Sequence, residues 1–222
     1  MKRVLPFIIV AVVGFVTLGA GVILYRAKRP QTATISKAMA ASKERGEEVH
    51  ARGPANAAVT LEEYGDFQCP PCGGLEMPLQ QIERDYASSL RVIFRNFPFT
   101  NHEHAHEAAY AAEAAGLQGR FWEMHDLLYR EQAAWAKTKD VQPVFDSYAG
   151  MIGLNLERFK NDAGGERVKE KVEADRKRGE ALGVKNTPTI FINNESVPPT
   201  SLNPTALRAA IDAAVKDKDN GS

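Results

Sequence analysis

The chain has 222 residues, of which 44% are hydrophobic, enough for one sizeable domain and an appendage. Its 28 Lys and Arg residues balance 28 Asp and Glu residues, so the formal net charge is zero. No basic tail or stripe is present in the sequence, which argues against nucleic-acid binding. With only two cysteines, the chain can form no disulfide except the one between them.

The predicted elements begin with an uncharged, apolar segment at residues 4–25. About 20 such residues span a bilayer, so residues 1–29 are predicted to be a single N-terminal transmembrane anchor. A cleaved signal peptide is the alternative, but the A-x-A-like sequence Ala38-Met39-Ala40 lies well beyond the apolar segment. Positive residues flank both ends, so the orientation follows from chemistry: an oxidising cysteine pair belongs outside the reducing cytosol.

The next residues, 30–55, are polar and rich in Ala, Lys and Glu, and are predicted to form a stalk. The predicted domain covers residues 56–222. Its first strand is predicted over residues 59–64, where β-formers alternate, and its first helix over 75–86, where apolar residues share one side. A second strand is predicted over residues 91–97.

Helical periodicity then dominates from about residue 102 to 182, with short breaks. A strand over 189–193, a short polar hairpin or loop, and a helix from about 204 to 216 follow. The order is β-α-β, a helical segment, then β and α. It predicts an α/β, thioredoxin-like fold with a helical insertion at about 102–182.

The two cysteines form Cys69-Pro70-Pro71-Cys72 between the first strand and the first helix. At or beside a helix N-cap, unpaired backbone N–H groups and the helix dipole favour an anion. The thiolate is the reactive form of cysteine, so Cys69 is the candidate nucleophile and Cys72 the candidate resolving thiol. The prolines suit a first turn, whose N–H groups lack helical partners. A structural zinc site needs about four ligands, and the chain has no second C-x-x-C.

Three histidines, His102, His104 and His106, form the one rival constellation. On a helix, His102 and His106 would share a face and could hold a metal, which with the cysteines would suggest a non-catalytic binding module. The segment has the pattern of a helix N-terminus after a loop, so surface histidines are the favoured interpretation. No metal and no other cofactor is expected.

Four segments in this order resemble the signature of DsbA-like thiol–disulfide oxidoreductases, with membrane-anchored bacterial members the most similar. They are EYGDFQCPPC at 63–72, FRNFP at 94–98, AEAAG at 112–116 with GRFWEMHD at 119–126, and NTPTIFI at 186–192. One C-x-x-C alone would be weak support, whereas four ordered segments are strong. The resemblance implies a thioredoxin fold with an all-helical insertion, placed on the extracytoplasmic side of the membrane.

The resemblance also implies that Pro188 is a cis-proline that faces the cysteine pair. It would bring the Thr187 backbone beside Cys69, where a substrate segment can pair as an added strand. A trans proline that opens a strand is the alternative. Together with Thr187, Pro70 and Pro71 are the predicted substrate-binding residues.

A family acidic position matches Glu63, six residues before the first cysteine. Because Glu63 shares strand parity with Leu61, it should point inward. A carboxylate there can exchange a proton with Cys72, with its own pKa raised by burial. The alternative is a solvated Glu63, with Glu62 in the inward position.

The direction of electron flow depends on the residues between the cysteines. The most oxidising family members have a histidine there, whereas Pro71 removes an N–H that could solvate the Cys69 thiolate. We therefore expect a milder oxidant. The leading hypothesis is a monomeric disulfide donor to exported proteins that is reset by a membrane redox partner. A disulfide reductase or isomerase of the same fold is the alternative.

Overall fold

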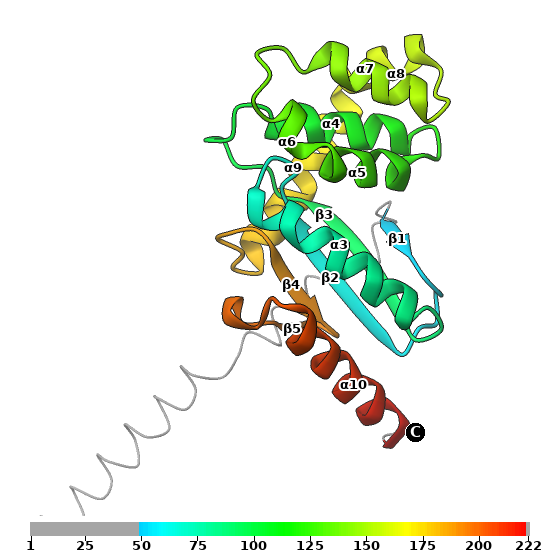
Figure 1. Cartoon of the computed structure of the whole chain (residues 1–222), viewed down its shortest axis with the longest axis vertical. Helices are drawn as coiled ribbons and strands as arrows, with labels where there is room; N and C mark the ends of the chain where they lie inside the picture. Colours follow the sequence, from blue (N-terminus) through cyan, green and yellow to red (C-terminus); the bar gives the residue numbers. More distant parts are fainter. Residues whose placement is uncertain (1–48, 221–222) are drawn as a thin grey trace, which may run out of the picture.

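The structure is a computed structural model that describes residues 49–220, with a five-stranded sheet, helices on both of its faces and a block of helices at one end (Figure 1). The predicted membrane anchor and residues 30–48 of the predicted stalk lie outside these residues. Between residues 49 and 220, no helix is both long enough and apolar enough to cross a bilayer.

The sheet has the strand order β1-β3-β2-β4-β5. Its central strands, β2 (Val59–Gly65) and β3 (Leu90–Asn96), are parallel and are joined by the helix α3 (Pro70–Asp85). Strand β4 (Thr189–Ile192) runs antiparallel to β2, and β5 (Glu195–Ser196) forms a hairpin with β4. The β-α-β unit and the late strand therefore agree with the thioredoxin-like pattern expected from the sequence.

The edge strand β1 (His50–Arg52) corrects the predicted stalk, which extended to residue 55. It pairs antiparallel with β3, so the sheet includes part of the segment that the sequence assigned to the stalk. The three residues of β1, His50, Ala51 and Arg52, are too few to show an apolar alternation that could reveal a strand. Hydrogen bonds to side chains far along the sequence hold β1 in place instead. His50 is hydrogen-bonded to Glu113, and Arg52 is hydrogen-bonded to Asp126.

Alternation along β2 directs its side chains to two different layers. Val59 and Leu61 pack against α3 and against α10 (Pro204–Asn220) in one apolar cluster. Tyr64 faces the opposite layer, where α9 (Glu166–Ala181) covers the sheet. Gly179 permits this close approach, since a Cβ there would lie 2.7 Å from the ring of Phe97.

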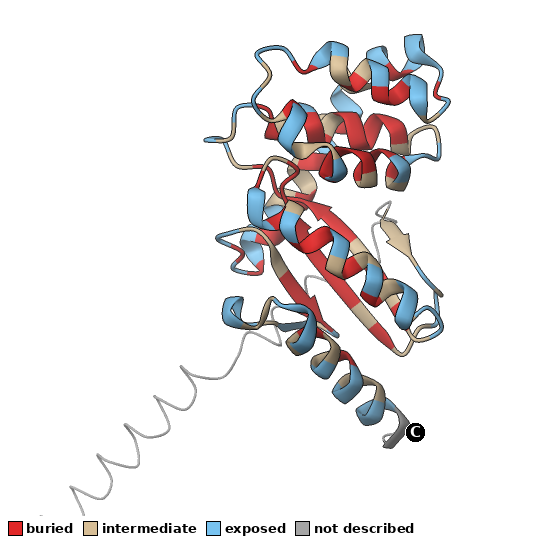
Figure 2. Cartoon of the chain, viewed as in Figure 1, coloured by how far each residue is buried: buried red, intermediate tan, exposed pale blue. Residues whose placement is uncertain are grey.

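A block of helices follows β3 and forms the predicted insertion up to residue 164, whereas the last part of that prediction, up to residue 182, is α9, which covers the sheet. Its central helix α4 has seven buried alanines, so neighbouring helices surround it on nearly all sides (Figure 2). Figure 1 shows the block at the end of the sheet near the start of α3. Its helices are α4 (Ala105–Gly116), α5 (Phe121–Arg130), α6 (Gln132–Trp135), α7 (Gln142–Met151) and α8 (Leu156–Gly164).

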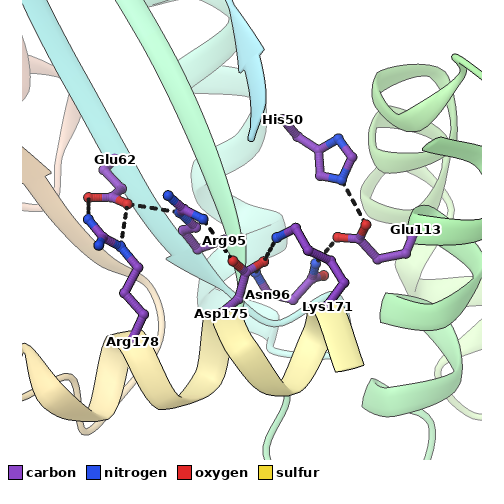
Figure 3. A network of polar contacts seen from close by, with 8 residues as sticks. All are labelled: His50, Glu62, Arg95, Asn96, Glu113, Lys171, Asp175 and Arg178. Atoms are coloured by element: carbon purple, nitrogen blue, oxygen red, sulfur yellow. Dashed lines mark hydrogen bonds and ion pairs between the residues drawn. The ribbon is translucent and has the colours of Figure 1, made fainter. Parts of the chain in front are cut away.

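A chain of polar contacts joins the sheet, α9 and the helical block (Figure 3). At its centre, the buried Arg95 guanidinium lies 2.9 Å from Glu62 Oε1 and 3.0 Å from Asp175 Oδ1. The chain continues through Asn96, which donates to Glu113 at 2.6 Å. Buried charges are tolerated where they are paired, and this pairing fixes α9 against the sheet. The remaining members are His50, Lys171 and Arg178.

Candidate active site

Cys69 is the N-cap residue of α3, in agreement with the sequence prediction, and Cys72 lies in the first turn of that helix. Pro70 and Pro71 occupy the first helical positions and are exposed beside Cys69. Both cysteines are free thiols, with exposed fractions of 6% for Cys69 and 1% for Cys72. The difference leaves Cys69 as the thiol that a substrate can reach.

The Thr187–Pro188 peptide bond is cis, so the trans alternative is wrong. The Thr187 carbonyl oxygen lies 3.3 Å from Cys69 Sγ and accepts its hydrogen bond. Thr187 and Pro188 are half-buried and immediately precede β4. The fold thus brings together two parts of the predicted site that are far apart in the sequence.

The two thiols differ in acidity as well as in exposure. A hydrogen bond from the Cys72 thiol lowers the pKa of Cys69 from 9.0 to about 6, against the opposing effect of burial. Burial raises the pKa of Cys72 well above 9.0, and the hydrogen bond to Cys69 and the charge of Glu63 act in the same direction. Cys69 is therefore the thiol of the pair that ionises first, while Cys72 keeps its proton.

Glu63 is buried and faces α3, as its parity with Leu61 predicts. Burial is the main cause that raises its pKa well above 4.5, followed by the charges of Glu76 and Glu83. Because a charge on Glu63 also raises the pKa of Cys72, the two groups are electrostatically linked. Glu62 points to the opposite face and pairs with Arg95, so the alternative with Glu62 inward is wrong.

Gln132 on α6 holds the loop before α3 and was not identified from the sequence. Its Nε2 donates to the carbonyl oxygen of Phe67 at 2.7 Å and to that of Cys69 at 2.9 Å. Gly73 leaves room for this side chain, since a Cβ there would lie 2.6 Å from Gln132 Oε1. A single glutamine about 60 residues after the cysteines carries no spacing signal that could reveal this contact.

Asp66 and Gln68 also hold the loop. Asp66 is buried, and its carboxylate accepts hydrogen bonds from the backbone N–H groups of Gln68 and Phe99. Gln68 accepts from the His104 N–H at 2.6 Å and donates to the Ala136 carbonyl at 3.0 Å. An Asp two residues before a loop N–H is a recognisable Asx-turn signal, whereas the Gln68 contacts depend on the tertiary fold.

The three histidines do not form the rival metal site. His102 precedes α4 and bonds to Asp66 at 2.7 Å, whereas His104 bonds to the Thr138 carbonyl. In the described part of the chain, the three potential metal ligands that do lie together are Glu76, His125 and Asp126. The Arg52 guanidinium already pairs with two of its members, Glu76 and Asp126.

Comparisons with known proteins agree with this geometry. A family model described as thioredoxin matches residues 45–213. BdbD from Bacillus subtilis, solved in its oxidised form, is 24% identical with a TM-score of 0.67, covering 75% of this chain and 92% of BdbD. The thiol-disulfide exchange protein α-DsbA2 from Wolbachia pipientis is 17% identical with a TM-score of 0.67, covering 82% of this chain and 97% of α-DsbA2. Both share the fold described above.

Among curated proteins, the Na⁺/H⁺ antiporter NhaA 1 of Salinispora arenicola is 39% identical over 167 residues. The match includes 74% of this chain but only 24% of the antiporter. The chain therefore spans about a quarter of the length of the curated relatives it matches.

Proposed function

We propose that this chain, which belongs to the thioredoxin family of thiol–disulfide oxidoreductases, donates its Cys69–Cys72 disulfide to cysteines of exported proteins on the extracytoplasmic side of a membrane. The asymmetry of the pair carries the proposal. Cys69 has a pKa of about 6 and is the more exposed thiol, whereas Cys72 is 1% exposed. Such a pair has one thiol for the substrate and one that closes or opens the disulfide.

Disulfide donation proceeds in two exchanges. A substrate thiolate attacks the Cys69 sulfur, the Cys69–Cys72 bond breaks, and Cys72 leaves as a thiolate that takes up a proton. A second substrate thiolate then attacks its neighbour's sulfur in the mixed disulfide, and Cys69 leaves as a thiolate. Two electrons pass from the substrate to the pair, and a low pKa makes Cys69 a good leaving group.

The acidity of Cys69 supports a milder oxidant than DsbA. Thiol pKa values are about 3.5 in DsbA and about 7 in thioredoxin, and the value of about 6 lies between them. A more stable thiolate favours the reduced form and so makes the disulfide more oxidising. A Cys69 pKa of about 6 is also compatible with a second candidate function, in which electrons flow the other way and the chain acts as a reductase or isomerase.

The reduction potential decides between the two directions. The full chain would be equilibrated with glutathione buffers, and the fraction of reduced Cys69 would be measured by alkylation. A potential between about −120 and −180 mV, the range of protein oxidants and isomerases, supports donation. A potential near about −270 mV, like that of thioredoxin, refutes donation and supports a reductase.

The proposed location depends on the uncharged segment at residues 4–25 as a membrane anchor, with residues after it as a stalk. The domain then works as a monomer next to a membrane redox partner that re-oxidises the pair. A maleimide that cannot cross membranes tests the location: after dithiothreitol has reduced the Cys69–Cys72 disulfide and been washed out, Cys69 should be labelled in intact cells. Labelling only after lysis would contradict it.

A further inference from the structure

The imidazole of His102 is hydrogen-bonded to Asp66, the first residue of the cysteine loop, residues 66–69. The distance from His102 Nδ1 to Asp66 Oδ2 is 2.7 Å. The Asp66 side chain is completely buried, whereas the His102 side chain is 26% exposed. His102 can therefore exchange a proton with the solvent while it contacts a carboxylate that the solvent does not reach.

Two hydrogen bonds within the cysteine loop hold the Asp66 carboxylate close to the nucleophile. Asp66 Oδ1 accepts a hydrogen bond from the Gln68 N–H at 2.8 Å. The Asp66 carbonyl oxygen accepts one from the Cys69 N–H at 3.0 Å, which closes a four-residue turn. Because Oδ1 is held at the residue that precedes Cys69, it lies at most about 10 Å from the Cys69 sulfur.

A buried carboxylate at this distance opposes the ionisation of Cys69, because two negative charges repel each other. The hydrogen bond from Cys72 lowers the pKa of Cys69 most, whereas burial and then the charge of Asp66 raise it. A positive charge on the imidazole that contacts Asp66 offsets this repulsion. Imidazole is the side chain that gains such a charge between about pH 5 and 8. That range includes the Cys69 pKa of about 6.

The ionisable neighbours of His102 along the chain have other partners. Glu103 is 78% exposed and lies 4.0 Å from His104. The ring of Phe99 packs edge-on against the imidazole of His102, at 5.9 Å between ring centroids. On the other side of the contact, the ionisable groups that face Asp66 are Cys69, Cys72 and Tyr129.

We propose that His102 is a positioning residue whose positive charge offsets the charge of Asp66 and so favours the Cys69 thiolate. The inference rests on the proposed exchange at Cys69 and adds a pH-responsive group to that site. His102 acts through Asp66 and needs no contact with the substrate. Because a more stable thiolate favours the reduced pair, protonation of His102 makes the disulfide a stronger oxidant.

The pH dependence of Cys69 alkylation in the reduced full chain tests the role of the charge. His102→Asn keeps an N–H donor near the position of Nδ1 but cannot become charged. We expect it to raise the midpoint of alkylation by about 0.5–1 pH unit. His102→Phe, which also removes the donor, should raise the midpoint at least as much. A midpoint for His102→Asn within about 0.2 pH unit of the wild type would overturn the proposal, because the contact would then be only structural.

His106→Asn is the matched control, because it removes an imidazole from the same segment. His106 is half-buried on α4, and its ring packs against that of Tyr110 at 6.1 Å between centroids. We expect the alkylation midpoint of this variant to match that of the wild type. An equal rise in His106→Asn and His102→Asn would assign the effect to net charge, and would overturn a role for the contact with Asp66.

A measurement on the wild-type chain covers the case in which the His102 variants do not fold. By thermodynamic linkage, a charge on His102 that favours the Cys69 thiolate must itself be favoured by that thiolate. An NMR titration of the imidazole signals should therefore give His102 a higher midpoint in the reduced chain than in the oxidised chain. Equal midpoints would overturn the proposal.

Failure of the proposed exchange gives a different result. If the reduced wild-type chain forms no mixed disulfide with glutathione disulfide, the exchange at Cys69 is refuted. The alkylation and NMR midpoints follow formation of the thiolate alone, so they still decide whether His102 favours it.

Discussion

Glu62 and Glu63 are consecutive residues of β2 whose buried carboxylates lie on opposite faces of the sheet. Glu62 accepts a hydrogen bond from Arg95 at 2.9 Å and lies within the polar chain of Figure 3. Glu63 lies on the α3 face, where burial and the neighbouring carboxylates raise its pKa. One strand thus supplies a paired carboxylate on one face of the sheet and, on the other, a buried carboxylate whose pKa is raised.

Replacing Glu63 by Gln should make the reduced protein progressively more stable than the wild type as the pH rises, by up to about 1–3 kcal/mol, because Gln cannot acquire a charge in this buried position. The pKa of Glu63 is raised on folding, so its contribution to stability is fully present below pH 4.5 and is lost as the pH rises towards the raised pKa. Urea unfolding at several pH values measures this, and the gain of Glu63→Gln should grow with pH.

Glu62→Gln is the control for that experiment. It should lower the free energy of unfolding by about 3 kcal/mol, because Arg95 and Arg178 lose a buried partner. Parallel stability curves for the wild type and Glu63→Gln would show that Glu63 does not titrate differently in the folded state.

Alkylation of Cys69 should reach half of its maximal rate at a pH of about 6. The hydrogen bond from Cys72 is the main cause of the lowered pKa, so Cys72→Ala should move this midpoint towards 9.0. Cys72→Ser, which keeps a hydroxyl donor, should give an intermediate midpoint. An unchanged midpoint in Cys72→Ala would assign the acidity of Cys69 to the helix N-terminus instead.

Gln132→Leu should destabilise the protein by about 1–3 kcal/mol, because two buried carbonyl groups lose their shared donor. Gln132→Glu should cost more, since a carboxylate cannot donate and would lie against the same oxygens. Urea unfolding measures both effects. Gln81→Leu, in an exposed contact with Asp85, should change little, and equal losses at both glutamines would contradict the bridging role.

Arg95→Met should lower the free energy of unfolding by about 3–5 kcal/mol, because Glu62 and Asp175 would remain buried without their shared cation. Arg120→Met removes an exposed pair with Glu123 and should cost no more than about 0.5 kcal/mol. Thermal and urea unfolding can compare the two variants. Similar losses would mean that the polar chain adds nothing beyond surface pairing.

Much of the sheet could be predicted from the sequence because alternation and periodicity are local signals. Strands β2, β3 and β4 and the helices α3 and α10 lie close to their predicted positions. The inward direction of Glu63 followed from parity alone. Strand β1 could not be predicted because its three residues gain their order from ion pairs with helices far along the chain.

The site residues also separate into those predicted from local signals or from the family resemblance and those placed only by the tertiary fold. Cys69 and Cys72 are adjacent to a strand-to-helix turn, so their geometry is local, and Pro188 was found through the family resemblance. Gln132 reaches the site from the helical block, and nothing near it in the sequence indicates which residues it will meet. Such contacts depend on how the helical block packs against the sheet and the cysteine loop.

The bridge from Gln132 to the Phe67 and Cys69 carbonyl groups limits how freely the helical block can be exchanged. A chimera that combined this sheet with the block of another relative would inherit an altered cysteine loop unless the new block placed an amide donor at the same point. Trimming the chain to a minimal thioredoxin would leave both carbonyl groups without that donor. During divergence, the block and the cysteine loop are therefore expected to change together.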